Sequence, residues 1–90
     1  MPVLRIPTLM RTYTEGKNEV PVRGKTVAEA MNNLILQYPA LRPHLYDREG
    51  VLRPFVNLFR GESNIKDLQG LDTPLDEDDR LVLIPSISGG

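Results

Sequence analysis

The chain has 90 residues, with 40% hydrophobic and 26% charged side chains, which is typical of one small folded domain with little room for a deep catalytic cleft. Its formal net charge of -1 argues against nucleic acid as a partner, because phosphate binding depends on a basic surface. The absence of cysteine excludes disulfides, thiolate nucleophiles and Cys-ligated zinc.

The first predicted elements are the two strands of a β-hairpin. Residues 3–10 are apolar and partly alternating, which predicts a strand. Residues 14–18 have a turn composition, and residues 19–23 alternate again. Because Pro21 cannot donate a ladder hydrogen bond, the second strand is predicted to lie at a sheet edge.

A helix is the next predicted element. Thr26 and Glu29 have capping-box spacing, in which each side chain accepts a hydrogen bond from the free N–H groups of the first turn. The apolar residues that follow at helical spacing are Val27, Ala30, Met31, Leu34 and Tyr38. Pro39 predicts that the helix ends at Tyr38.

The second half of the chain predicts a returning sheet. Residues 40–50 are predicted as a connector, and residues 53–60 as a strand with Val56 and Leu58 on one face. Residues 61–74 are predicted as a loop with short extended pieces around Ile65 and Leu71. A polar turn at 76–79 then leads into a last strand at 80–85. This order indicates a two-layer α+β domain in which one sheet face stays partly open.

The sequence contains no pattern typical of an enzyme or a metal site. His44 is the only histidine, and we interpret it as a surface or packing residue. The carboxylates at 76–79 lack calcium-loop spacing, and no glycine-rich phosphate loop is present. No apolar run reaches the length of a membrane span and no signal-peptide pattern is present, so we expect a cytoplasmic protein without a membrane partner.

The remaining candidate for chemistry is the end of the sequence, Ser88-Gly89-Gly90. Glycine has no Cβ, so two glycines make a thin segment with an unhindered carbonyl. Five residues from Ser86 extend at most about 17 Å, which is enough to enter a narrow active site while the domain docks outside it. A carboxylate is unreactive, so a separate enzyme must activate it, for example by adenylation with ATP.

The sequence resembles the MoaD/ThiS family of sulfur carriers, which has the ubiquitin-like β-grasp fold. The family resemblance rests on the apolar strand and proline at 81–85 followed by the two glycines. Further segments are most similar to the branch that serves cysteine synthesis (the CysO type): Ile6-Pro7-Thr8-Leu9-Met10-Arg11 with Thr14 and Gly16, Phe55-Val56-Asn57-Leu58, and Ile84-Pro85. The resemblance implies a β-grasp domain at 1–85, with a mixed sheet and one main helix on one face, and a flexible diglycine tail at 86–90.

The resemblance also implies a mechanism, in which the chain is a co-substrate of partner enzymes and binds no cofactor itself. An enzyme of the ubiquitin-activating type would adenylate Gly90 with ATP, and a sulfur donor would convert it to a thiocarboxylate beside Gly89. In the cysteine branch the acceptor would be an activated serine in a pyridoxal-phosphate synthase. A metalloprotease would then release cysteine.

The strand pattern predicts where partners dock. Phe55 and Phe59 point away from Val56 and Leu58, so we assign the phenylalanines to the open sheet face. We assign two residues of the last strand, Val82 and Ile84, to the same face, and Ile87 of the tail extends this partner-binding set. The alternatives are that a loop covers these residues or that the two faces are exchanged.

Other functions compatible with the sequence are a molybdopterin synthase small subunit, a thiamine sulfur carrier, a ubiquitin-like modifier that joins Gly90 to lysines, and an interaction domain without tail chemistry. The sequence does not distinguish the sulfur pathways, because that choice depends on the partner enzymes.

Overall fold

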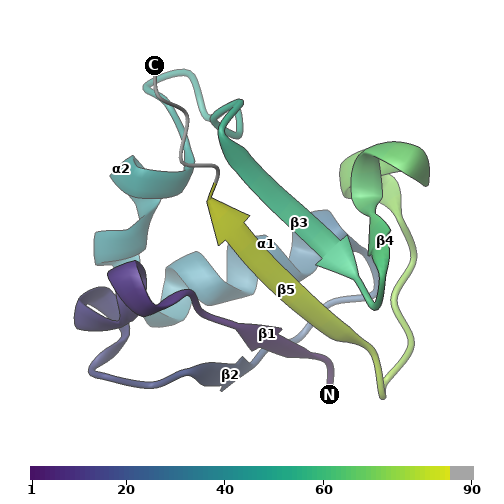
Figure 1. The fold of residues 1–90 in the computed structure, drawn as a ribbon, viewed down its shortest axis with the longest axis horizontal. Helices are drawn as coiled ribbons and strands as arrows, with labels where there is room; N and C mark the ends of the chain where they lie inside the picture. The colour runs from purple at the N-terminus through teal and green to yellow at the C-terminus, as the bar shows by residue number, and fades with distance from the viewer. Residues whose placement is uncertain (86–90) are drawn as a thin grey trace.

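The computed structural model describes residues 1–85, which form a five-stranded mixed sheet in the order β2-β1-β5-β3-β4 (Figure 1). The strands are β1 (Val3–Arg5), β2 (Glu19–Pro21), β3 (Val56–Arg60), β4 (Ser63–Asn64) and β5 (Arg80–Pro85). The central strands β1 and β5 are parallel, and every other pair is antiparallel. The last strand therefore lies in the middle of the sheet, and β2 lies at the edge, as Pro21 predicts.

The main helix, α1 (Val27–Gln37), crosses one face of this sheet (Figure 1). Thr26 is the N-cap, and its Oγ1 accepts a hydrogen bond from the Glu29 backbone N–H at 3.2 Å. The Glu29 carboxylate accepts from the Lys25 N–H at 2.9 Å, one residue before the partner expected of a capping box. Both side chains therefore bind free N–H groups at the start of α1, as the sequence predicts.

The core lies between α1 and the face of the sheet that it covers. The sheet residues in this buried cluster are Leu4, Val20, Val56, Leu58, Leu81 and Leu83, and the α1 residues are Val27, Ala30, Met31 and Leu34. Each buried leucine contributes roughly 1.5–3 kcal/mol through its removal from water. The predicted architecture, with one helix on one face of a mixed sheet, is confirmed.

The predicted strand at 3–10 is wrong beyond its first half. β1 ends at Arg5, and Thr8–Thr14 forms a 3-10 helix, η1, that connects β1 to β2. Pro7 precedes this helix in an extended conformation, and its carbonyl accepts from the Met10 N–H at 2.9 Å. The side chain of Met10 is buried, so the apolar spacing between Ile6 and Met10 fits a helical turn rather than a strand.

The predicted connector at 40–50 also contains helical structure. Pro39–Leu41 forms the 3-10 helix η2, and Arg42–Leu45 forms the short helix α2. Leu41 and Leu45 are fully buried, four residues apart, which is the spacing of one helix face. This segment closes one end of the core.

The segment between β3 and β5 agrees only in part with its prediction. The short strand β4 (Ser63–Asn64) lies directly before Ile65, where a short extended piece is predicted, but Ile65–Asp67 and Gly70–Asp72 form the 3-10 helices η3 and η4. The turn at 76–79 is confirmed, because the Asp79 carboxylate accepts from the Asp76 N–H at 2.7 Å. β5 has the predicted bounds, and β3 begins three residues later than predicted.

Candidate functional site

The candidate site is built on the sheet face opposite α1. Along β5, Leu81 and Leu83 are buried, whereas Val82 is half-buried and Ile84 is 44% exposed. Phe59 of β3 lies directly opposite Val82 and is also half-buried. Phe59, Val82 and Ile84, called here the open-face patch, therefore lie together on the face that the sequence assigns to them.

Phe55 does not belong to this ladder. It lies in the turn before β3 and is 38% exposed, while Ile84 pairs with Asn57 and Pro85 pairs with Val56. Sequence alternation extended the strand too far toward its N-terminus. The strand register therefore fixes the position of Phe59 but not that of Phe55.

A groove of about 240 Å³ lies at the end of β5, next to the open-face patch. It is lined by Arg5, Ile6, Pro7, Thr8, Arg11 and residues 82–85. Arg5 lies beside Val82 in the parallel β1–β5 pairing, and Arg11 donates from Nε to the Ile6 carbonyl at 3.2 Å. The groove thus brings two guanidinium groups next to the apolar patch.

Sequence reasoning missed both arginines. Arg5 alternates with the buried Leu4 and Ile6, so strand periodicity contains a signal for its place on the open face. Arg11 has no comparable signal, since its position depends on η1, which was predicted as a strand and turn.

One ion pair crosses the open face. Arg80 Nη1 and Glu19 Oε2 are 2.8 Å apart, and their side chains are 64% and 36% exposed. Glu19 also lies opposite Arg5 in the β1–β2 register, yet its carboxylate contacts Arg80. Within residues 1–85 neither Arg5 nor Arg11 has an acidic partner within 4.0 Å, so this end of the face carries positive charge.

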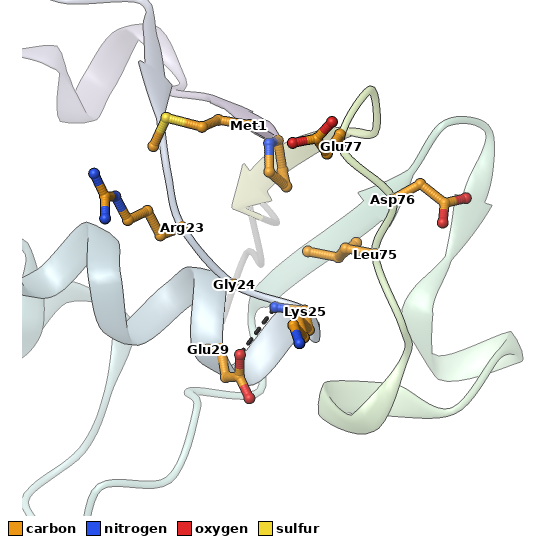
Figure 2. A pocket seen from close by; sticks show the side chains of 9 residues that line it. Met1, Arg23, Gly24, Lys25, Glu29, Leu75, Asp76 and Glu77 are labelled. Atoms are coloured by element: carbon orange, nitrogen blue, oxygen red, sulfur yellow. Dashed lines mark hydrogen bonds between the residues drawn. The ribbon is translucent and has the colours of Figure 1, made fainter.

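A larger hollow lies elsewhere, beside the N-terminus and the start of α1 (Figure 2). Its volume is about 490 Å³, and its lining carries charges of both signs: Arg23, Lys25, Glu29, Asp76 and Glu77. Gly24 approaches α1 closely there, because a Cβ would stand 2.5 Å from the Ala30 backbone nitrogen. The hollow is at the end of the sheet where β1 and β5 begin, away from the open-face patch.

Two further features singled out in the sequence are His44 and the carboxylates at 76–79. The His44 ring is stacked on Tyr13, with centroids 4.2 Å apart, which confirms a packing role at the surface. In the described part of the chain, no three His, Asp or Glu side chains are placed to bind one metal ion. None of the helices in residues 1–85 is long and apolar enough to cross a membrane.

Gly89, Gly90 and Ile87 lie outside the described residues, so their predicted roles stay predictions. The structure does locate the point where the chain leaves the sheet. Pro85, the last residue of β5, lies opposite Val56 and lines the groove of Arg5 and Arg11. The segment that contains the glycines therefore begins next to the open-face patch.

Comparisons with known proteins bear on the family and the fold of the chain. The profile of the ThiS family matches residues 4–90. The sulfur carrier protein CysO of Mycobacterium tuberculosis is 29% identical over 87 residues, which cover 94% of each chain. A chain in the crystal structure of the Amycolatopsis orientalis BexX/CysO complex superposes with a TM-score of 0.89 at 27% identity, with all of both chains covered.

A third similar protein is the small archaeal modifier protein 1 of Methanosarcina acetivorans. Its solution structure superposes with a TM-score of 0.89 at 26% identity, covering 99% of this chain and 95% of that protein. These neighbours confirm the β-grasp fold, since their similarity extends over the whole sheet and helix.

Proposed function

Because the chain belongs to the ThiS family, we propose that it is a sulfur carrier in cysteine synthesis, with Gly90 as the residue that bears the sulfur. The observation that carries this proposal is a family match that extends through Gly90, together with similarity to CysO over 94% of both chains. The chain acts as a co-substrate, and the catalytic groups belong to its partners.

The chemistry requires four partner-catalysed steps. The Gly90 carboxylate attacks the α-phosphate of ATP on an activating enzyme, which forms an acyl-adenylate and releases pyrophosphate. Hydrosulfide from a sulfur donor then displaces AMP, and the product is a thiocarboxylate, a proton and AMP. The thiocarboxylate sulfur then replaces the leaving group on Cβ of an activated serine at a pyridoxal-phosphate synthase, so that cysteine is joined to the Gly90 carbonyl and the activating group is released. A metalloprotease hydrolyses this link, which releases cysteine and restores the carboxylate.

The open-face patch is suited to docking with these partners. Its apolar side chains lie next to the point where the chain leaves β5, and Arg5 and Arg11 border them. Contact with an apolar surface that also carries carboxylates would bury the patch and pair the guanidinium groups. A partner held there is also near the start of the segment that ends in Gly89 and Gly90.

The test is an intact-mass measurement after incubation with the activating enzyme, ATP and a sulfur donor. We expect the mass to rise by the difference between one sulfur and one oxygen atom, with the change confined to Gly90. Deletion of Gly90 should abolish the product and leave thermal unfolding unchanged. A deletion variant that still accepts sulfur would contradict the proposal, and so would a mature protein that extends past Gly90 without trimming.

A modifier function is the second candidate, because the small archaeal modifier protein 1 superposes as closely as the CysO chain does. The same incubation distinguishes the two functions when lysine-bearing proteins are present. A ladder of Gly90 conjugates supports the modifier, and a single thiocarboxylate product supports the carrier. Sulfur transfer to a molybdopterin or thiazole synthase, in place of the pyridoxal-phosphate synthase, would assign the chain to another branch of the family.

A further inference from the structure

A second hollow, of about 310 Å³, lies outside the candidate site, between α2 and the loop that leads to β3. The residues that line it are Arg42, Pro43, Tyr46, Asp47, Arg48 and Arg53. Three guanidinium groups therefore border one small depression, which is an unusual concentration in a chain of net charge -1. We call this depression the arginine pocket.

Backbone and side-chain hydrogen bonds hold the two sides of the arginine pocket together. The Arg53 N–H donates to the Leu45 carbonyl at 2.9 Å, and Arg53 Nε donates to the Pro43 carbonyl at 3.0 Å. Tyr46 and Leu52 form an antiparallel bridge between these contacts. Arg53 is thus fixed against α2, whose first residue is Arg42.

The single acidic residue in the lining is engaged by the backbone. Asp47 Oδ1 accepts hydrogen bonds from the N–H groups of Glu49 at 2.9 Å and Val51 at 3.0 Å. Within residues 1–85 no ion pair joins Asp47 to any of the three arginines. The lining therefore carries three positive charges and one negative charge, a net charge of two positive units.

Tyr46 adds a neutral donor to this lining. Its side chain is 9% exposed, and among the described residues its hydroxyl has no hydrogen-bond partner. The hydroxyl is not sealed in the core, since residues 1–85 contain no fully buried polar side-chain atom without a partner. Burial raises the pKa of Tyr46 above its ordinary value, with the Arg42 charge opposing this, so the phenol remains a donor at neutral pH.

We propose that the arginine pocket binds a dianionic oxyanion of the phosphate type. Guanidinium groups donate paired hydrogen bonds to phosphate oxygens, and a dianion matches the net charge of the lining better than a single carboxylate does. The Tyr46 hydroxyl supplies a further donor. The source is inorganic phosphate or the phosphate group of a nucleotide.

The arginine pocket lies at the end of the sheet where the chain leaves β5. The Val56 N–H donates to the Arg53 carbonyl at 3.0 Å, and Val56 lies opposite Pro85. An anion bound there would be on the same end of the domain as the segment proposed to be adenylated. The binding itself is independent of the sulfur-carrier proposal and can be measured without any partner enzyme.

The test is a titration of the ¹⁵N-labelled full chain with inorganic phosphate at constant ionic strength, followed by amide NMR shifts. We expect saturable shifts centred on residues 42–53, and no saturable shifts with acetate. Parallel titrations with AMP and adenosine identify the source. Tighter binding of AMP than of phosphate indicates a nucleotide site, whereas equal affinity together with inert adenosine indicates a phosphate site.

Variants distinguish the pocket from general charge attraction. Arg42→Gln and Arg48→Gln should each weaken phosphate binding about fivefold or more, which corresponds to the loss of one charge-assisted contact. Tyr46→Phe keeps the packing and should weaken binding about threefold. Arg23→Gln removes an exposed arginine outside the pocket and should leave the affinity unchanged, and thermal unfolding of each variant checks its fold.

Three results would overturn the proposal. These are shifts that grow linearly without saturation, equal shifts with acetate, and an equal loss of affinity in Arg23→Gln and Arg48→Gln. Each would show that phosphate interacts with exposed positive side chains in general and is not bound in the arginine pocket.

Discussion

The two faces of β5 show how one strand serves two purposes. Leu81 and Leu83 are buried under α1, whereas Val82 and Ile84 lie on the open face, where Ile84 is 44% exposed. The covered face accounts for the fold, because its side chains leave water when the chain folds. Folding gives little reason for apolar side chains on the open face, and their grouping with Phe59 is the basis of our proposal that a partner protein docks there.

The largest expected contrast between the faces is in stability. Leu83→Ala should lower the free energy of unfolding by about 2–5 kcal/mol, because it removes buried methyl groups and leaves a cavity. Ile84→Ala, the neighbouring residue on the opposite face, should cost less than about 1 kcal/mol. Urea unfolding of both variants makes the comparison. Equal losses would show that the open face is covered by the chain itself.

The second contrast concerns sulfur loading, for which we expect a substitution on the open face to have the larger effect. Ile84→Asp should lower kcat/KM for sulfur loading about 30-fold, as expected for a charge placed in the apolar centre of an interface. Leu36→Asp introduces the same charge at a site on α1 that is 78% exposed, so it is the matched control. We expect it to leave loading nearly unchanged. If the two variants were loaded equally well, the partner would dock elsewhere.

The covered face could be predicted from the sequence because helix and strand periodicity determine it directly. Thr26, Glu29 and the apolar spacing at 27–34 locate α1, and the alternation at 80–85 places β5 with its correct bounds. The same alternation placed Val82, Ile84 and Phe59 on the open face. These residues have regular backbone, in which side-chain direction follows from position alone.

The irregular segments could not be predicted in this way. Ile6 and Met10 fit either a strand or a helical turn, and the structure selects the turn because Pro7 starts η1. Leu41 and Leu45 had helical spacing that a connector prediction overlooked. Arg11 of the groove and Arg42 of the arginine pocket depend on these segments, so their places became visible only with the tertiary structure.

A smaller effect is expected on the covered side, at the start of α1. Thr26→Ala removes the side chain that accepts the Glu29 N–H and should lower the free energy of unfolding by about 1 kcal/mol. Loading by the activating enzyme should not change, since Thr26 lies at the start of α1, on the side opposite the open-face patch. Thr26→Ser keeps the acceptor and should restore most of the lost stability. If Thr26→Ala is loaded more slowly under conditions where the variant is fully folded, α1 also contacts the partner.

The smallest effect is expected for the ion pair of Arg80 and Glu19 on the open face. Arg80→Gln should change the free energy of unfolding by less than about 0.5 kcal/mol, because Coulomb attraction between side chains that are 64% and 36% exposed is screened by water. A double-mutant cycle with Glu19→Gln isolates the pair, and its coupling should fall further as salt is added. Coupling above about 1 kcal/mol that salt does not weaken would show that the pair is desolvated. The open face would then stabilise the fold through its charged side chains. The contrast between a covered face that stabilises the fold and an open face that does not would hold for apolar packing but not for electrostatics.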